Sequence, residues 1–173
     1  AIIKGFKGFD HTAALQAMVE TSTQPRLQAP DWAQRNWDLL NKYGYLPYDL
    51  EPNGEAVSKT LEHGYGDDAV ARVAKLLEQN ETALRFSQRA KGYQQLWDAS
   101  TGVMRGKNSQ GSWREPFNPD TPTSPLNNPG DYTEANAWQY SNYVPQDFSG
   151  YINLLGSKAQ FETNLDTLFL AHP

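Results

Sequence analysis

The sequence predicts an all-α fold built from successive antiparallel helix pairs, and three observations support this prediction. Apolar residues recur at spacings of three and four along most of the chain, as they do on one face of a helix. Capping residues precede these stretches, and glycine follows several of them. The sequence has no convincing strand-like alternation of polar and apolar residues. Its 173 residues fit one domain or part of a larger one.

Caps and apolar spacing place two helices in the first 44 residues. Thr12 is expected to cap the first, whose apolar face comprises Leu15, Met18 and Val19. Asp31 is expected to begin the second, because Gln34 lies three residues further on, as in a capping box. Gly44 then stops that helix, whose apolar side comprises Trp32, Leu39, Leu40 and Tyr43.

The next two helices are longer. The third is expected from about residue 55 to 77, with an apolar ladder of Val57, Leu61, Tyr65, Ala69, Val73 and Leu76. Gly64 and Gly66 each weaken a helix by about 1 kcal/mol relative to alanine, so we expect close packing at both. Asn80 is expected to cap the fourth helix, whose apolar residues are Phe86, Ala90, Tyr93 and Trp97.

Residues 98–132 are rich in Gly, Pro, Asn and Ser, which predicts a long loop of the kind that is functional or a linker. Its embedded apolar residues favour an ordered loop folded back on the body; they are Met104, Trp113 and Phe117.

Three shorter helices complete the prediction. The fifth runs from about residue 134 to 144, and Asp147 caps the sixth, which ends at Gly156. Ser157 and Gln160 form a capping box for the seventh, whose buried side comprises Phe161, Leu165, Leu168 and Phe169.

Composition excludes several classes of function. The formal net charge of −5, with scattered basic residues, argues against nucleic-acid binding. The absence of cysteine excludes disulfides, zinc–thiolate sites and cysteine nucleophiles. The sequence contains no apolar stretch long enough to span a membrane, and its first ten residues show no signal-peptide pattern.

The strongest site candidate is the run from Tyr132 to Tyr140. Glu134 is expected in the first turn of the fifth helix, where the helix dipole alone favours a carboxylate. The functional reading is a general acid whose pKa is raised in a partly desolvated cleft, walled by Tyr132, Trp138 and Tyr140. Asn136 and Gln139 offer polar groups for a sugar or a cation, and Trp138 offers a stacking face.

A second candidate lies on the third helix, where Ser58 and Glu62 share one face. The structural alternative is a capped helix on which Ser58 and Glu62 belong to a solvated or ion-paired face. Cleavage of a glycosidic bond would need a second carboxylate beside Glu134. Three are possible, and spacing does not choose between them: Asp67, Asp68 and Asp147. The histidines at 11, 63 and 172 lack metal-ligand spacing.

Six ordered motifs resemble glycoside hydrolase family 92 over nearly the whole chain. They are KGFKGFD at 4–10, GYLPYDLE at 44–51, VSKTLE at 57–62, TGVMRGK at 101–107, W..PFNP at 113–119 and EANAWQYSNYVPQD at 134–147. The resemblance implies a calcium-dependent, inverting, exo-acting α-mannosidase, often specific for α-1,2 linkages, with an (α/α)6 toroid. It also implies that Glu134 is the general acid, that Asn136 and Gln139 lie near the −1 sugar or the cation, and that VSKTLE belongs to an interior helix.

The sequence departs from the family pattern at several positions. Ala135 stands for the usual Gly, Asn118 for Asp in the P-F-D-P run, and Gln146 for His in V-P-H-D. His63, Gly64 and Gly66 interrupt an aromatic-rich continuation of T-L-E. These changes are expected to alter the leaving-group subsite or to lower activity.

Family members are several hundred residues long, so residues 1–173 are expected to be an internal fragment of the toroid. The resemblance implies that an N-terminal β-sandwich and the C-terminal part of the toroid, with its general base, are absent. The expected partners are mannose-containing glycans and the remainder of the catalytic domain, and the expected location is the periplasm, cell surface or medium. The isolated chain is expected to be inactive.

Three alternatives remain open from the residues. One is a non-catalytic sugar-binding helical module in which Trp138, Trp113 and Tyr132 stack on a glycan. Another is a structural helical array in which Glu134 only serves a helix terminus. The third is a different α/α-toroid glycosidase that acts on glucosides.

Overall fold

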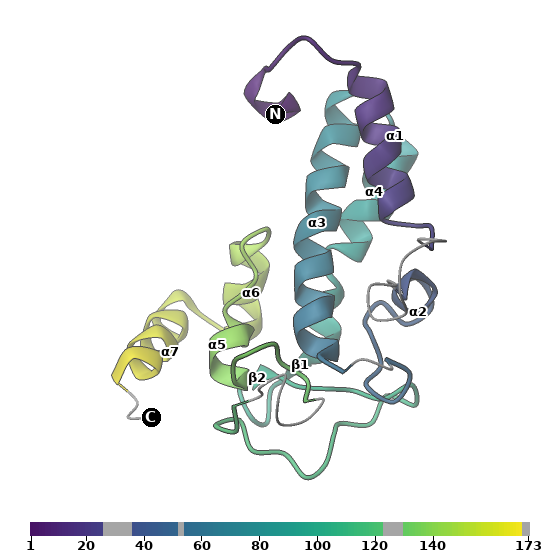
Figure 1. Ribbon diagram of the computed structural model, residues 1–173. Coiled ribbons are helices and arrows are strands. Elements are labelled where there is room, and N and C mark those ends of the chain that lie inside the picture. The colour runs from purple at the N-terminus through teal and green to yellow at the C-terminus, as the bar shows by residue number, and fades with distance from the viewer. Residues whose placement is uncertain (26–35, 52–53, 123–129, 171–173) are drawn as a thin grey trace.

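A computed structural model describes residues 1–25, 36–51, 54–122 and 130–170. Its centre is an antiparallel pair, α3 (Ala56–Leu76) and α4 (Asn80–Arg89), and α1 (His11–Thr21) packs beside α3 (Figure 1). Within the described ranges the only sheet is the two-stranded pair β1 (Trp97–Asp98) and β2 (Val103–Met104). The predicted all-α class is therefore confirmed.

The first helix begins as expected but with a different cap. A short 3₁₀ turn, η1 (Ile2–Lys4), precedes it. Asp10, not Thr12, is the N-cap: its Oδ1 accepts the backbone N–H of Thr12 at 2.8 Å and of Ala13 at 3.0 Å. The Asp10 carboxylate thus provides an acceptor for two N–H groups of the first helical turn that have no partner within the helix. The predicted apolar face packs inward, with Leu15 fully buried.

The second described α-helix is α2 (Trp37–Tyr43), which begins after Asn36. The predicted start at Asp31, with Trp32 and Gln34, lies outside the described residues. Gly44 ends the helix as predicted, with a left-handed φ of 76° and its N–H donated to Leu40 O.

The bounds predicted for α3 are confirmed, but its apolar ladder is partly wrong. Tyr65 and Leu76 are exposed by 50% and 57%. The buried residues instead recur at alternating steps of three and four, as at Thr60, Gly64 and Asp67, so Tyr65 and Leu76 fall outside this face. Gly64 is closely packed as predicted, since a Cβ there would lie 3.1 Å from Ala90 O, whereas Gly66 faces open space.

The fourth helix is shorter than predicted. Its N-cap is Gln79 rather than Asn80, and the chain tightens after Arg89 into the 3₁₀ helix η3 (Gly92–Leu96). Gly92 permits this, because a Cβ there would lie 2.3 Å from the carbonyl oxygen of Gly44. Trp97 therefore belongs to β1, where it pairs with Met104 of β2. Two-residue strands are too short to show any alternation in sequence.

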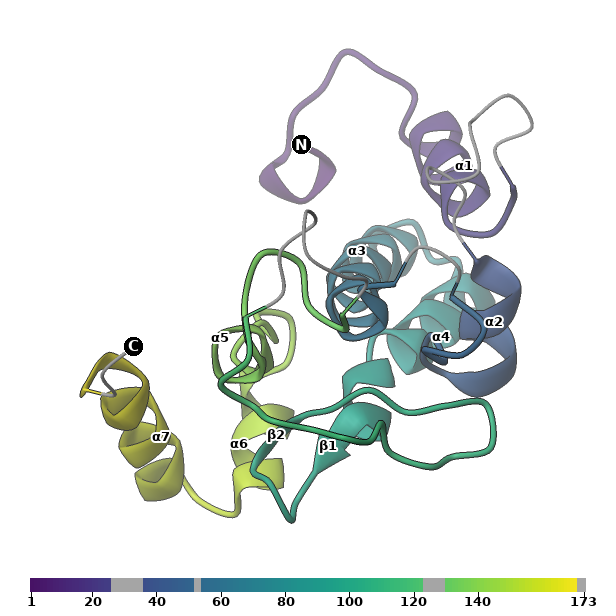
Figure 2. The same cartoon turned by 60° about the horizontal axis from the view of Figure 1, so that its bottom comes forward.

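The C-terminal helices are α5 (Ala137–Ser141), α6 (Phe148–Leu155) and α7 (Lys158–Leu170). Asp147 caps α6 and Gly156 follows it, as predicted. The predicted capping box of α7 is only half formed: Ser157 Oγ accepts the N–H of Gln160, whose side chain donates to Asn164 instead. No residue of α7 is fully buried, so the predicted buried side is only partly covered by the described residues. Phe161 packs against Tyr151 and the main core, Leu165 and Leu168 are half-buried, and Phe169 is exposed. Figure 2 shows α7 projecting beyond α6.

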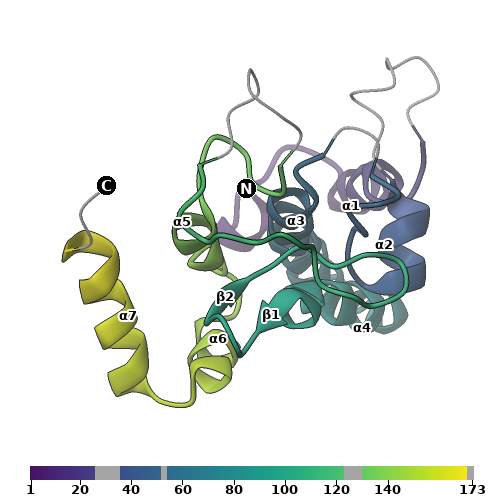
Figure 3. The same cartoon turned by 90° about the horizontal axis from the view of Figure 1, so that it is seen from below.

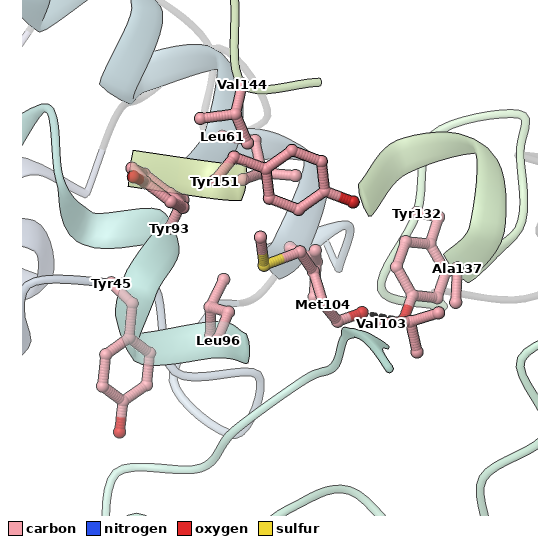
Figure 4. Close-up of a cluster of buried hydrophobic side chains, with 11 residues drawn as sticks. Tyr45, Leu61, Tyr93, Leu96, Val103, Met104, Tyr132, Ala137, Val144 and Tyr151 are labelled. Carbon is pink, nitrogen blue, oxygen red and sulfur yellow. Dashed lines mark hydrogen bonds between the residues drawn. The ribbon is translucent and has the colours of Figure 1, made fainter. Parts of the chain in front are cut away.

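The main core lies where the long loop meets α3. Residues from η3, the hairpin, α5 and α6 surround Leu61, and Figure 4 shows them converging on Met104. Seen from below, the segment after β2 crosses beneath the helices before it reaches α5 (Figure 3). The described part of the loop is folded back as predicted, since Met104 is buried and Phe117 packs against this core.

Leu61→Ala should lower the free energy of unfolding by about 2–5 kcal/mol, because Leu61 is completely buried and its loss leaves a cavity. The measurement is urea unfolding of the purified protein. Leu84→Ala on α4 is the matched control, since Leu84 is exposed and both residues are good helix formers. Equal losses in the two variants would contradict this account of the core.

Candidate functional site

The candidate site begins where residues 130–131 close the start of α3. The helix has no side-chain cap, so its first N–H groups need other acceptors. Gly130 O accepts the N–H of Glu55 at 2.6 Å, and Asp131 O accepts those of Val57 and Ser58 at 3.1 and 3.2 Å. The main chain of the candidate segment is thereby attached to α3.

An ion pair with a buried carboxylate also fixes Asp131 beside the start of α3. Arg114 donates from Nε and Nη2 to the two oxygens of Asp131, at 2.6 and 2.9 Å, and the Asp131 side chain is 3% exposed. The guanidinium lies 3.8 Å from the ring centre of Tyr48. A Cβ at Gly106 would overlap the Asp131 carboxylate, so glycine allows this close approach.

The next two residues are also attached to the core. The Tyr132 hydroxyl donates to Met104 O at 2.6 Å (Figure 4), and burial raises the pKa of this phenol far above its ordinary value. The N–H of Thr133 donates to Ser58 Oγ at 2.8 Å. Tyr132 is buried, so it forms part of the support of the site rather than the predicted cleft wall.

The prediction that Glu134 lies in the first turn of a helix is wrong. The helix starts later, at Ala137, because Asn136 and Gln139 form a capping box that defines the first turn. Glu134 precedes that cap with a left-handed φ of 50° and an exposed side chain. The helix dipole of a first turn therefore does not account for Glu134. The predicted enclosure by aromatic rings is not formed by the described residues.

The predicted substrate-binding residues have structural contacts. Asn136 Oδ1 accepts the N–H of Gln139 at 3.1 Å, and Gln139 Oε1 accepts that of Asn136 at 3.0 Å. Trp138 Nε1 donates to Asp120 at 2.8 Å. Together with Trp97 and residues at the facing ends of α6 and α7, Trp138 lines a pocket of about 440 Å³. A role in sugar binding for these three side chains stays a prediction.

The three candidates for a second carboxylate are all engaged. Asp67 accepts from Nε and Nη2 of Arg89, each at 2.7 Å, and Asp68 pairs with Arg72. Asp147 caps α6 and accepts the Tyr93 hydroxyl at 2.8 Å.

The second sequence candidate also proves to be part of this region. Glu62 accepts the Tyr140 hydroxyl at 2.7 Å, and Ser58 binds Thr133, so this face of α3 contacts the candidate segment. By contrast, the carboxylate of Glu134 has no hydrogen bond or ion pair with any described residue.

No metal centre is apparent in the described ranges, where no three His, Asp or Glu side chains converge as ligands. The calcium implied by the resemblance stays a prediction. His11 Nε2 lies 3.2 Å from Phe6 O, and the His63 ring packs against Trp37. His172 lies outside the described residues.

Comparison with known proteins identifies the family. Residues 1–173 match the glycosyl hydrolase family 92 catalytic domain. The chain belongs to family 92. It aligns with the family GH92 α-mannosidase BT3965 from Bacteroides thetaiotaomicron, solved in complex with mannoimidazole, at 40% identity and a TM-score of 0.88. That alignment covers 99% of this chain and 22% of the mannosidase.

Two further relatives agree. The inverting mannosidase BT2199 from the same bacterium is 29% identical with a TM-score of 0.86, over 100% of this chain and 22% of its own. A curated protein of Arthroderma benhamiae, described as an uncharacterized secreted glycosidase, is 28% identical over 92% of this chain and 23% of its own. The family 92 chain thus spans about a fifth of each relative. Among its described helices, none is both long and apolar enough to cross a membrane.

Sequence reasoning missed the buried charges of this family 92 chain. Arg105 is 6% exposed and donates to Asp98 at 2.8 Å, to Glu115 and to the carbonyl of Arg114, with its guanidinium 4.5 Å from the Phe117 ring centre. Arg105 lies within TGVMRGK, so the motif marked the position, but its partners meet only after the loop folds back.

Asp98→Asn should remove an acid-sensitive part of the stability. Burial by itself raises the pKa of Asp98, but the hydrogen bonds from Ser100 and Arg105 outweigh it, so the pKa is lowered. A carboxyl group with a lowered pKa contributes its full stabilisation when the pH is above the ordinary aspartate pKa. That stabilisation is lost as the pH falls through the pKa of the folded state. At pH 7 the variant should lose about 3 kcal/mol, because a buried charge pair is broken.

The measurement is urea unfolding of wild type and variant from pH 7 to pH 2.5, and the difference between them should shrink below about pH 4. Asp166→Asn, at an exposed position of α7, is the control and should follow the wild type. A difference that stays constant with pH would contradict the assignment.

Proposed function

We propose that this chain forms part of the catalytic domain of an inverting, exo-acting α-mannosidase, with Glu134 as the general acid. The observation that carries the proposal is the family 92 match over the whole chain. It is supported by the 40% identity to an α-mannosidase solved with mannoimidazole and by the similarity to an inverting mannosidase.

The contacts of the acidic residues support Glu134 as the acid. Asp131, Glu62 and Asp120 all contact the segment, but they bind Arg114, Tyr140 and Trp138. Glu134 is exposed and unpaired among the described residues, so its carboxyl group is available to a substrate. Its main chain is attached on both sides, which gives a general acid a defined position.

In an inverting reaction the acid protonates the glycosidic oxygen while a base activates water on the opposite face of the sugar. The two carboxyl groups then lie about 6.5–9.5 Å apart. Asp67, Asp68 and Asp147 are each held by structural partners, which makes them poor candidates for the base. We therefore place the general base in the remainder of the catalytic domain, outside residues 1–173.

The rest of the proposal follows the family resemblance. The substrate would be a glycan ending in α-linked mannose, with α-1,2 as the expected linkage and calcium as the expected cofactor. Export to the periplasm, cell surface or medium accords with a relative described as secreted. A non-catalytic sugar-binding module is the alternative, but Tyr132, one of its three stacking rings, is buried beneath the segment.

Glu134→Gln in the full-length parent enzyme should lower kcat on α-1,2-mannobiose by about 10²–10⁴-fold, because proton donation to the leaving oxygen is lost. Activity on 2,4-dinitrophenyl α-mannoside should fall much less, since that leaving group departs without a proton. The measurement is steady-state kinetics on both substrates, with glucosides included to test the glucosidase alternative.

Glu81→Gln, at an exposed position of α4, is the control and should leave both activities unchanged. Retained binding of mannose with no turnover in the unaltered parent would favour the binding module instead. Equal losses on both substrates in Glu134→Gln would contradict the acid role.

The isolated chain of 173 residues should release no mannose from α-1,2-mannobiose, with calcium or with a chelator, because the proposed base is missing. The measurement is mannose release, with circular dichroism to confirm that the chain is helical and the full-length parent as the positive control. Calcium-dependent release by the isolated chain would mean that a working base lies within these residues.

A further inference from the structure

One face of α3 contacts the candidate segment on both sides of Glu134. Ser58 Oγ accepts the N–H of Thr133 at 2.8 Å, directly before Glu134. One turn later on α3, Glu62 Oε1 accepts the hydroxyl of Tyr140 at 2.7 Å, from α5. Residues four apart lie on one helix face, so a single rigid element holds both ends of the stretch that contains Glu134.

The hydroxyls of Ser58 and Tyr140 are both engaged within the protein. Ser58 is completely buried, and its hydroxyl is used by the main chain of Thr133. The Tyr140 phenol is kept protonated, because burial and then the hydrogen bond to Glu62 raise its pKa, although the nearby hydroxyls of Ser58 and Thr133 oppose this. The Tyr140 hydroxyl therefore remains a donor to Glu62 throughout the working pH range.

The conformation of Glu134 explains why such a hold is needed. A non-glycine residue with φ of 50° lies in the left-handed region, which costs about 1–2 kcal/mol relative to the right-handed one. It persists only where the surroundings determine it. Here the hydrogen bond from Thr133 to Ser58 fixes the backbone before Glu134. The capping box of α5 and the bond from Tyr140 to Glu62 fix the backbone after it.

We propose that Ser58 and Glu62 are positioning residues, which hold the Glu134 loop between Thr133 and Tyr140 so that the Glu134 carboxyl group meets the glycosidic oxygen. The inference rests on the proposed acid role of Glu134. It explains why the Ser58–Glu62 face of α3 contacts this segment, whereas the sequence left a second site and a solvated or ion-paired surface as alternatives for that face. A shift of about 1 Å in a catalytic group can cost about a hundredfold in rate.

The experiment uses the full-length parent enzyme with Ser58→Ala and Tyr140→Phe, each of which removes one contact. Both should lower kcat on α-1,2-mannobiose by about 10–100-fold, with KM changed less than about threefold. Activity on 2,4-dinitrophenyl α-mannoside should stay near the wild type, because that substrate needs no acid. Glu62→Gln keeps an acceptor for Tyr140 and should keep most of the activity.

Ser87→Ala, at an exposed position of α4, is the matched control and should behave as the wild type. If Ser58→Ala fails to fold, Tyr140→Phe alone carries the test. Equal losses on both substrates, or no loss on mannobiose, would overturn the positioning role. Glu134→Gln in the same assay separates the two proposals. If this variant loses activity equally on the two substrates, the acid role of Glu134 is wrong. If only Ser58→Ala and Tyr140→Phe lose activity equally on both, the positioning role alone is wrong.

Discussion

The start of α3 is the constraint on which the rest of this structure depends. A helix leaves its first N–H groups without partners, and α3 has no side chain that caps them. The carbonyl groups of Gly130 and Asp131 accept them instead, across more than seventy residues of chain. The long loop must therefore return to this point, and Glu134 follows three residues later. The packing of the core and the location of the candidate acid thus have a common origin.

Buried charges reinforce this connection at three places. Asp131 pairs with Arg114 beside the start of α3, Asp98 pairs with Arg105 across the hairpin, and Asp67 pairs with Arg89 between α3 and α4. A buried carboxylate is costly unless it is paired and hydrogen-bonded. Each pair therefore favours one arrangement of the two segments that it joins. The hydrogen bond from the Tyr132 hydroxyl to the Met104 carbonyl completes the support of the segment.

The family resemblance and the local contacts contribute different parts of the functional argument. Family 92 membership points to the reaction and to Glu134, but it does not say how a residue in a left-handed conformation is held. The contacts answer that question, since the segment is attached before and after Glu134 while its carboxylate stays free of described partners. A site of this kind combines a rigid main chain with an available acid, which is what general acid catalysis requires.

By itself, the sequence determined the local features: the helical periodicity of α3, the glycine that ends α2, the cap of α6 by Asp147 and the run that contains Glu134. These depend on contacts within one helical turn, which spacing and residue type reveal. Only the tertiary structure decided that Glu134 precedes its helix, that Tyr132 is buried and that α3 holds the segment through Ser58 and Glu62. Those outcomes depend on partners 28 to 78 residues away or on competition between neighbouring caps, and a single sequence carries no record of which distant groups will meet.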